Sequence, residues 1–303
     1  MKTSADSRPL ATELSADAVS VSGLVRDFGR FQLGPLELTV PTGYVTGLVG
    51  ANGAGKTTLL KLLLGLQTPD AGAMSLLGSP VTGANVAVRE DIGVVFDAPF
   101  VLPDWTVTKA GRAIAPFYSR WSPDLFDSFV QRFHLDPHAT VKSLSRGEGT
   151  KLMLALAMAH QPRLLLLDEP TSGLDPATRR DLLDLFAEFM AADDSHTILF
   201  STHITSDLER LADHVRVLSH GRLVETGTVD EVLERYAVVR GPRRVLTQQT
   251  RSLIHGLHER ADIFDGLIDT AHTSGFGPAV VIDPATLDDV VVHLSTTEQE
   301  VSA

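Results

Sequence analysis

A glycine-rich segment, GANGAGKT at residues 50–57, has the residue types and spacing of a phosphate-binding loop. Its glycines allow consecutive backbone N–H groups to turn inward around phosphate oxygens, and the N-terminus of a following helix adds partial positive charge. In this pattern Lys56 contacts the β and γ phosphates of a nucleotide, and the hydroxyl of Thr57 is a ligand for Mg²⁺. The predicted nucleotide-binding residues are Gly50, Ala51, Asn52, Gly53, Ala54, Gly55, Lys56, Thr57 and Thr58.

Two acidic residues, Asp168 and Glu169, directly follow four leucines at residues 164–167. Such a run is typical of a strand buried on both faces of a parallel sheet, and ligands of open α/β sheets bind where these strands end. There Asp168 can hold Mg²⁺, directly or through water, while Glu169 orients and polarises an attacking water. The alternative is that the two acids only end a strand and cap the next helix, and the phosphate-binding loop earlier in the chain disfavours it.

Strands and helices alternate along the chain in a way that would bring these side chains together. Apolar residues 44–49 predict a strand before the loop, and the leucines of 57–66 predict a helix after it that ends near Gly65. Further strands are predicted at 73–77, 92–96, 163–167 and 197–201, and further helices at 152–159 and 176–190. Residues 19–40 favour short antiparallel strands, and residues 101–144 favour an inserted helical subdomain. The expected fold is therefore α/β with a mainly parallel sheet and an antiparallel β part at the N-terminus.

The C-terminal part of the chain has a different pattern. The segment RGPRR at 240–244 predicts a linker, although a basic spot that meets phosphate or lipid is the alternative. Beyond it we predict one apolar strand at 279–282 and a helix in TLDDVVVHL at 286–294. The predicted division is a flexible leader at 1–18, a main domain at 19–236 and a small α+β appendage at 237–303.

Three polar residues of the appendage, His255, His258 and Glu259, could lie on one face of a helix like metal ligands. However, Gly256 intervenes and their order fits no common zinc motif. Solvated polar side chains are the favoured interpretation.

Composition excludes several classes of protein. The 303 residues include 26 Lys and Arg against 38 Asp and Glu, and a net charge of −12 disfavours broad binding to nucleic acid or anionic lipid. The absence of cysteine excludes disulfides, thiolate metal sites and cysteine nucleophiles. No uncharged stretch is the continuous apolar run of about 20 residues that spans a bilayer. The N-terminus lacks the apolar centre of a secretory signal, so a cytoplasmic location is expected.

Five motifs in order, GANGAGKT, SLSRGE, LLLLDEP, SGLD and the histidine of STH, resemble those of the nucleotide-binding subunit of an ABC transporter. The resemblance covers roughly residues 19–236. It implies that Ser145 and Gly147 contact the γ phosphate of ATP held by a second ATPase subunit, in a homodimer or a heterodimer. It also implies that Asp175 belongs to the loop coupling the two sites and that His203 contacts the γ phosphate; the alternative for His203 is a polar residue that ends a strand.

The resemblance also suggests roles for residues that depart from the family pattern or fit it loosely. Phe28 matches the aromatic residue that stacks on adenine, with a core phenylalanine as the alternative. Asp97 stands where the family has a glutamine that senses Mg²⁺ and the γ phosphate, and its oxygen can still reach the metal. The usual LSGGQ is LSRGE here, so Arg146 and Glu148 are substitutes while the serine and the second glycine are kept.

The function implied by the resemblance is ATP hydrolysis, with ATP and Mg²⁺ bound, by in-line attack of a water that Glu169 positions. A separate transmembrane permease, contacted through residues 101–144, would hold the protein at the inner face of the cell membrane. The segment IGVVFDAPF at 92–100 and the C-terminal tail are most similar to those of bacterial ATPase subunits that serve exporter-type permeases.

Two alternatives remain open at this stage. One is an ABC ATPase that acts on ribosomes or DNA, which the acidic charge, the single phosphate-binding loop and the lack of a sustained heptad pattern disfavour. The other is a nucleotide-binding scaffold without turnover, which the presence of Glu169 and Thr57 disfavours.

Overall fold

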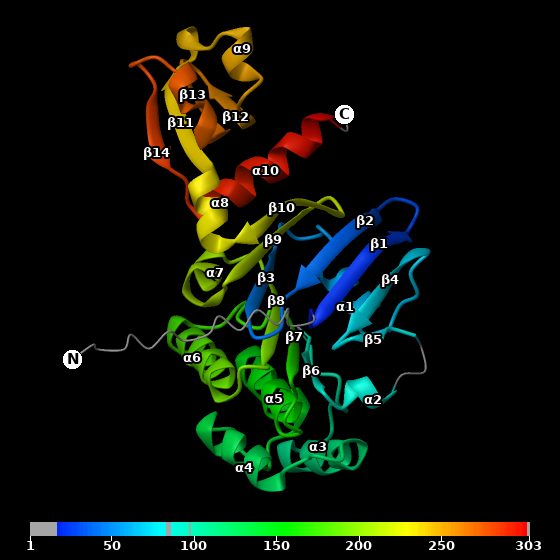
Figure 1. Cartoon of the computed structure of the whole chain (residues 1–303). Helices are drawn as coiled ribbons and strands as arrows, with labels where there is room; N and C mark the ends of the chain where they lie inside the picture. Colours follow the sequence, from blue (N-terminus) through cyan, green and yellow to red (C-terminus); the bar gives the residue numbers. More distant parts are fainter. Residues whose placement is uncertain (1–16, 83–85, 97, 302–303) are drawn as a thin grey trace, which may run out of the picture.

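The computed structural model describes residues 17–82, 86–96 and 98–301 (Figure 1). Three sheets follow one another along the molecule: an N-terminal antiparallel sheet, a mainly parallel core sheet and a C-terminal antiparallel sheet. Most of the predicted leader at 1–18 and the predicted metal contact Asp97 lie outside the described residues. None of the helices in the described ranges combines the length and apolarity needed to cross a bilayer.

The N-terminal sheet confirms the predicted antiparallel start of the fold. Its strands are β1 (Val19–Asp27), β2 (Gln32–Val40), β4 (Ala71–Leu76) and β5 (Ser79–Pro80), in the order β2-β1-β4-β5. Burial alternates along the second half of β2 because one face of the strand packs on the core and the other faces solvent.

The core sheet has the strand order β10-β9-β3-β8-β7-β6. Its strands are β3 (Val45–Val49), β6 (Ile92–Val95), β7 (Leu164–Asp168), β8 (Thr197–Thr202), β9 (His214–Ser219) and β10 (Arg222–Thr228). Strands β3, β7 and β8 run parallel and are buried at every residue, as the run of four leucines predicts for β7. Because β3 and β7 flank β8 in parallel, the loop after β3 and the acids that end β7 meet at the same edge of the sheet.

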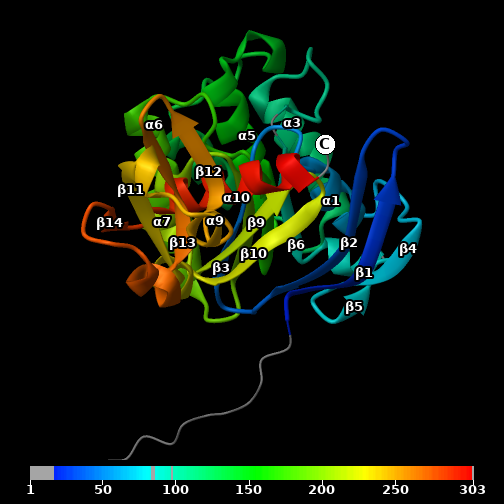
Figure 2. The same cartoon turned by 90° about the horizontal axis from the view of Figure 1, so that it is seen from above.

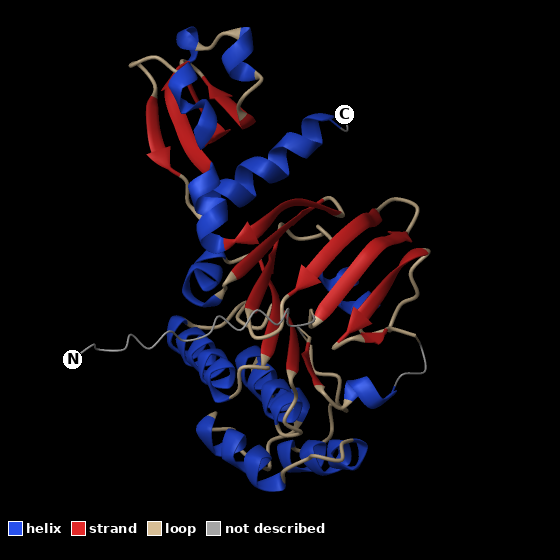
Figure 3. Ribbon diagram, viewed as in Figure 1, coloured by secondary structure: helices blue, strands red, loops and turns tan. Residues whose placement is uncertain are grey.

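Helices cover this sheet and form the end of the molecule opposite the C-terminal sheet (Figure 3). The helices of this part are α1 (Lys56–Leu63), α2 (Val86–Arg89), α3 (Val107–Ile114), α4 (Pro123–Arg132), α5 (Arg146–Met158), α6 (Pro176–Ala192) and α7 (Thr205–Leu211). Short 3₁₀ turns, η1 (Ala115–Phe117) and η2 (Val141–Ser143), extend the helical part formed by α3 and α4. Helix α5 is buried from Leu152 to Met158, which fixes the segment that begins at the LSRGE motif against the core.

The C-terminal sheet is larger than predicted. Helix α8 (Val229–Arg235) leads into β11 (Tyr236–Pro242), β12 (His255–Arg260), β13 (Ile263–Asp269) and β14 (Val281–Pro284), in the order β12-β13-β11-β14. The turns η3 (Arg243–Val245) and η4 (Thr270–Gly275) and helix α9 (Gln248–Arg251) connect them. The final helix, α10 (Leu287–Val301), contacts β12 and β13 and also β9 and α7 of the core, so it lies between the two parts (Figures 1 and 2).

One prediction for this part was wrong, and the helical arrangement considered for three of its polar residues is not found. Residues 240–242 of the segment predicted as a linker continue β11, because they pair with β13 and Arg240 also pairs with β14. His255, His258 and Glu259 lie on strand β12 and not on a helix face, since they form an antiparallel ladder with β13.

Candidate active site

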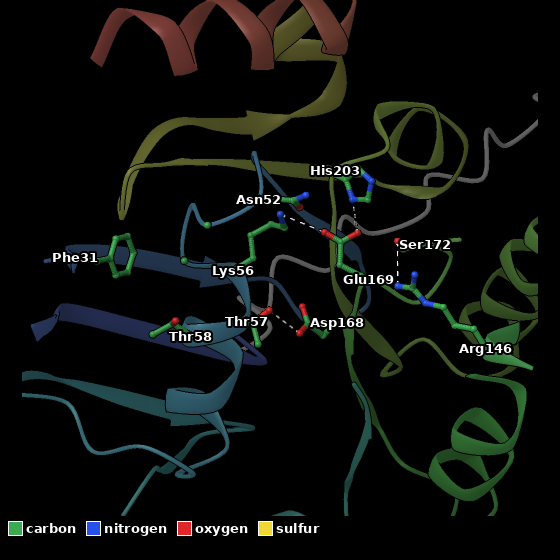
Figure 4. Close-up of a pocket in the computed structure, with 12 residues that line it drawn as sticks. Phe31, Asn52, Lys56, Thr57, Thr58, Arg146, Asp168, Glu169, Ser172 and His203 are labelled. Atoms are coloured by element: carbon green, nitrogen blue, oxygen red, sulfur yellow. Dashed lines mark hydrogen bonds and ion pairs between the residues drawn. The ribbon is translucent and has the colours of Figure 1, made fainter. Parts of the chain in front are cut away.

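A cavity of about 560 Å³ opens at the carboxyl edge of the core sheet (Figure 4). It is lined by the predicted residues Asn52, Gly53, Gly55, Lys56, Thr57, Thr58, Asp168, Glu169 and His203. Three further lining residues that the sequence analysis did not assign to this pocket are Phe31, Arg146 and Ser172. Residues from distant parts of the chain therefore converge on one site.

The loop between β3 and α1 depends on its glycines. Gly55 has a φ of +112°, and a Cβ added there would lie 2.8 Å from Leu33 Cδ1. A Cβ at Gly50 would lie 2.1 Å from the carbonyl oxygen of Leu218. No side chain of the described residues caps the N-terminus of α1, so its first N–H groups face the loop. This arrangement suits an anionic ligand.

The ammonium of Lys56 is buried at the centre of the site. Its Nζ donates hydrogen bonds to the carbonyl oxygens of Gly50 (2.7 Å) and Ala51 (3.2 Å) and lies 3.2 Å from Glu169 Oε1. Ala54 packs into the hydrophobic core, and its N–H bonds to the Ala51 carbonyl, which closes the turn. The backbone of the loop thus holds the lysine against the carboxylate that ends β7.

Oxygen donors gather beside this lysine. Thr57 Oγ1 donates to Asp168 Oδ2 (2.7 Å), and Ser201 Oγ donates to Asp168 Oδ1 (2.6 Å). Asp168 is 3% exposed, whereas Thr57 is open to the cavity. A hydroxyl next to an oriented carboxylate is the hard oxygen donor set that Mg²⁺ prefers.

Glu169 has a backbone conformation that is uncommon for its residue type, with a φ of +51°. Ser201 stabilises it, because the Glu169 N–H bonds to both the carbonyl oxygen and the hydroxyl of Ser201, each at 3.1 Å. Its Oε2 lies 2.7 Å from His203 Nδ1 and its Oε1 faces Lys56 (Figure 4). The carboxylate is therefore fixed between two nitrogen groups and points into the cavity.

The aromatic residue at the site is Phe31. Among the described residues only Phe31 of the pair in RDFGRF lines the cavity, whereas Phe28 is 44% exposed with the Arg26 guanidinium 5.1 Å from its ring centroid. The Phe28 N–H bonds to the Phe31 carbonyl oxygen in the turn between β1 and β2, and the two rings stack with 6.3 Å between their centroids, Phe31 on the cavity side. The hexapeptide contains both rings, so its sequence could have suggested either.

The LSRGE segment forms the N-terminus of α5. Ser145 caps the helix by accepting from the Glu148 N–H, and Glu148 Oε2 accepts from the hydroxyl (2.7 Å) and the N–H (2.8 Å) of Ser145. These hydrogen bonds, that of the hydroxyl first, hold the pKa of Glu148 below its ordinary value. The spacing of Ser145 and Glu148 matches a capping box, and this contact could have been predicted from it.

The residues that the family resemblance assigns to the dimer lie at the N-termini of α5 and α6. Arg146 lines the cavity, and its Nη2 lies 3.4 Å from Ser172 Oγ. Ser145 and Gly147 are not among the described residues that line the cavity. Asp175 caps α6 by accepting from the N–H groups of Ala177 (3.0 Å) and Thr178 (3.1 Å). Hydrogen bonding from Thr178, from its side chain first and then from its N–H, lowers the pKa of the Asp175 carboxyl.

Comparison with known proteins agrees with this geometry. The family model for the ABC transporter matches residues 33–172. The nickel import ATP-binding protein NikO of Rhodobacter capsulatus is 39% identical over 225 residues, which cover 70% of this chain and 89% of that protein. The chain belongs to the ABC transporter ATP-binding subunits. The Nod factor export ATP-binding protein I of a Rhizobium species is 33% identical and covers 74% of this chain and 75% of that protein.

Solved structures of this family support the same assignment. The ATP-binding subunit of an ABC transporter is 28% identical with a TM-score of 0.65, covering 71% of this chain and 91% of that one. CbiO1 of Clostridium perfringens, part of the ABC transporter complex CbiONQ, is 24% identical with a TM-score of 0.60 and covers 71% of this chain and 90% of that one, which shows the shared fold. The ABC subunit described here is an ATPase that energises transport, and the ribosome- or DNA-associated alternative is set aside.

Proposed function

We propose that this ABC subunit hydrolyses ATP with Glu169 as the residue that positions the attacking water. The observation that carries the proposal is the fixed carboxylate of Glu169, held between Lys56 Nζ (3.2 Å) and His203 Nδ1 (2.7 Å) at the edge of a cavity lined by the phosphate-binding loop. A carboxylate with restricted orientation can accept a proton from water and align its oxygen for in-line attack. His203 contacts the same carboxylate, which supports a role for this histidine in sensing the γ phosphate.

The residues present also fit Mg²⁺. Thr57 Oγ1 and Asp168 Oδ2 lie 2.7 Å apart and would hold the ion, with Ser201 orienting Asp168. When bound, Mg²⁺ offsets the negative charge of the β and γ phosphates. Lys56 adds a second positive charge from the loop, and Asn52, Gly53 and Gly55 line the cavity, where their N–H groups would donate to the phosphates. The chain thereby stabilises charge without any covalent step.

The ATP site of this subunit is proposed to be completed by a second ATPase subunit. Ser145 and Gly147 lie at the N-terminus of α5, where Ser145 is exposed. Among the described residues, neither of them lines the cavity of its own chain. Helix N-termini bind phosphate, so this surface suits the γ phosphate of ATP held by the partner. Asp175, at the start of α6, would lie in the same interface.

Mixing two inactive variants tests the composite site. Lys56→Ala damages the phosphate-binding loop, and Ser145→Arg blocks the phosphate contact at α5. In a mixed dimer one site combines both defects, and the other has an intact loop and an intact α5. We expect the mixture to recover a measurable part of the wild-type ATPase rate, while each variant alone stays inactive. A mixture no faster than its parts would contradict the composite site.

The transport function requires a membrane partner, which we propose to be a separate permease bound through residues 101–144. Three large apolar side chains around α3 are strongly exposed: Phe100 (56%), Leu102 (58%) and Phe117 (75%). Exposed apolar groups of this size favour a protein interface. The solved relative CbiO1 is part of the ABC transporter complex CbiONQ. Binding to the permease would place this subunit at the inner face of the cell membrane.

A further inference from the structure

The C-terminal sheet and α10 bring together two histidines and an aspartate far from the ATP site. His258 lies on β12, Asp265 on β13 and His293 on α10, and one ligand atom from each lies within 4.8 Å of the other two. Only His258 belonged to the group that the sequence pattern suggested. The other two residues, Asp265 and His293, lie later in the chain, on β13 and α10.

The two strands place the first pair of donors. His258 and Asp265 are directly opposite in the antiparallel ladder of β12 and β13, so their side chains project from the same face of the sheet. His258 Nδ1 lies 3.7 Å from Asp265 Oδ2. Both side chains are 33% exposed, which leaves a path from solvent to their donor atoms.

A glycine allows the third donor to approach. Gly256 of β12 has a φ of +53°, and a Cβ added there would lie 2.3 Å from the carbonyl oxygen of His293 and 2.7 Å from its Cα. The backbone of α10 can therefore come this close to β12 only at a glycine. The His293 side chain is 6% exposed and is inserted between the helix and the sheet.

The hydrogen bond of His293 Nδ1 orients the ring so that Nε2 faces Asp265. Its Nδ1 lies 2.8 Å from the carbonyl oxygen of Gly256 and must donate, because a carbonyl only accepts. In the neutral ring Nε2 then carries the lone pair, and this atom lies 3.8 Å from Asp265 Oδ2. Metal-binding histidines are commonly held in this way, with the other ring N–H bonded to a backbone carbonyl.

The separations fit a shared cation better than direct hydrogen bonds. At 3.7 and 3.8 Å the two nitrogens are too far from Asp265 Oδ2 for N–H···O bonds. Donors about 2.0–2.1 Å from a tetrahedral ion are about 3.3 Å from one another, so each nitrogen is within about half an ångström of the separation from Asp265 Oδ2 that a shared ion requires. Two neutral imidazoles and one carboxylate also place a single negative charge next to a dication.

We propose that His258, Asp265 and His293 form a binding site for a divalent transition-metal ion of the Zn²⁺, Co²⁺ or Ni²⁺ class. Imidazole nitrogens favour these ions over Mg²⁺ and Ca²⁺, which prefer oxygen ligands throughout. Three protein ligands leave one position for water in a four-coordinate ion. The bound ion ties α10 to β12 and β13, and the site is independent of the ATPase chemistry.

The test uses the full chain, free of any affinity tag and nucleotide, after removal of metals by chelation. Zn²⁺ binding is measured by calorimetry in excess Mg²⁺, so that the oxygen donors of the ATP site are occupied. Co²⁺ binding is followed by visible absorption, whose intensity reports four-coordinate geometry. The expected result is about one equivalent of each ion at this site, with intense Co²⁺ absorption.

Substitutions of the ligands decide the assignment. His258→Gln and Asp265→Asn should each weaken Zn²⁺ binding at least about tenfold and abolish the intense Co²⁺ absorption. The matched control is His272→Gln in the same sheet region, where an exposed histidine lies 3.9 Å from Asp269 and the described residues supply no third donor. This control should bind like the wild type. ATP hydrolysis at the wild-type rate shows that each variant is folded.

One variant tests the geometry without removing a ligand. Gly256→Ala would push α10 away at His293 and should also weaken Zn²⁺ binding at least about tenfold. The proposal is overturned if the wild-type chain binds no Zn²⁺ in excess Mg²⁺. It is equally overturned if folded His258→Gln binds as tightly as the wild type, or if His272→Gln loses binding to the same extent.

Discussion

The orientation of the Asp168 side chain is fixed by its hydrogen bonds and its burial. Both carboxylate oxygens accept hydrogen bonds from hydroxyls, one from Thr57 on α1 and one from Ser201 on β8. Burial of the group at 3% exposure leaves it few alternative orientations. The charge of Asp168 is therefore directed toward the Thr57 hydroxyl, where Mg²⁺ is proposed to bind.

The first prediction concerns this charge. Asp168→Asn keeps the size of the side chain but removes the negative charge, so the Mg²⁺ concentration for half-maximal ATP hydrolysis should rise at least about tenfold. The measurement is the hydrolysis rate at fixed ATP over a range of Mg²⁺. Asp104→Asn, at a side chain that is 81% exposed, is the control. An unchanged Mg²⁺ dependence in Asp168→Asn would remove this residue from the metal site.

The second prediction concerns the aromatic contact to adenine. Because Phe31 lines the cavity, Phe31→Ala should weaken ATP binding roughly tenfold or more, the usual effect of losing a base-stacking ring. Phe28→Ala, at an exposed ring in the same turn, is the matched control and should bind ATP as the wild type does. Dissociation constants from calorimetry compare the two. The opposite ranking would restore Phe28 as the stacking residue.

Residues of the site differ in how well a sequence can predict them. The spacing of Gly50, Lys56 and Thr57 is local, so one segment was enough to predict a phosphate-binding loop. Phe31 and Phe28 both occur in RDFGRF, and only the turn between β1 and β2 decides which ring faces the cavity. Arg146 reaches the site through the position of α5, which depends on packing that no short motif records.

At the scale of elements, His160 links three parts of the fold just after α5. Its ring is 1% exposed, stacks on Tyr118 with 3.9 Å between centroids, and places Nε2 3.2 Å from the carbonyl oxygen of Ile92 on β6. Burial lowers the pKa of His160, because the charged form loses its hydration. The folded chain therefore holds this histidine neutral at pH values where the unfolded chain binds a proton.

The third prediction follows from the sign of that shift. As the pH falls below about 6.5, the unfolded chain takes up a proton that folded His160 resists, so the free energy of unfolding decreases. His160→Gln should reduce this loss of stability between about pH 7.5 and 5.5. His138→Gln, at an exposed position, is the control. Urea denaturation at several pH values measures the effect, and equal pH dependence in all three proteins would refute it.

Elements with continuous apolar runs were predictable, and those held by distant partners were not. Strand β7 consists of four leucines and an aspartate, and burial at every residue leaves only the centre of a parallel sheet for it. Strand β12 reads HGLHER, which has no apolar run of its own. It is a strand because β13 pairs with it and α10 packs against Gly256, and both contacts depend on tertiary structure.

At the scale of the whole molecule, the helical part and the C-terminal sheet lie at opposite ends of the ATPase core (Figure 1). The exposed apolar side chains around α3 belong to the first end, and the proposed metal site belongs to the second. Contact with a permease and binding of a transition metal can therefore occur without competing for one surface.

The fourth prediction tests the permease surface. Phe117→Asp should lower several-fold the fraction of the subunit recovered with membranes from cells that contain its permease, because a charge replaces an apolar contact. Ile263→Asp, at a 59% exposed residue of the C-terminal sheet, is the matched control. The ATPase rate of both purified variants should equal that of the wild type. Unchanged membrane recovery of Phe117→Asp would exclude this residue from the interface.

The most direct test of the central claim is the ATPase rate of Glu169→Gln, measured together with its affinity for ATP. Glutamine has the same size but cannot accept the proton of water as a carboxylate does, so hydrolysis should fall at least about 100-fold. ATP affinity should change little, because the phosphate-binding loop and Phe31 are intact. Hydrolysis at the wild-type rate would show that Glu169 does not position the attacking water.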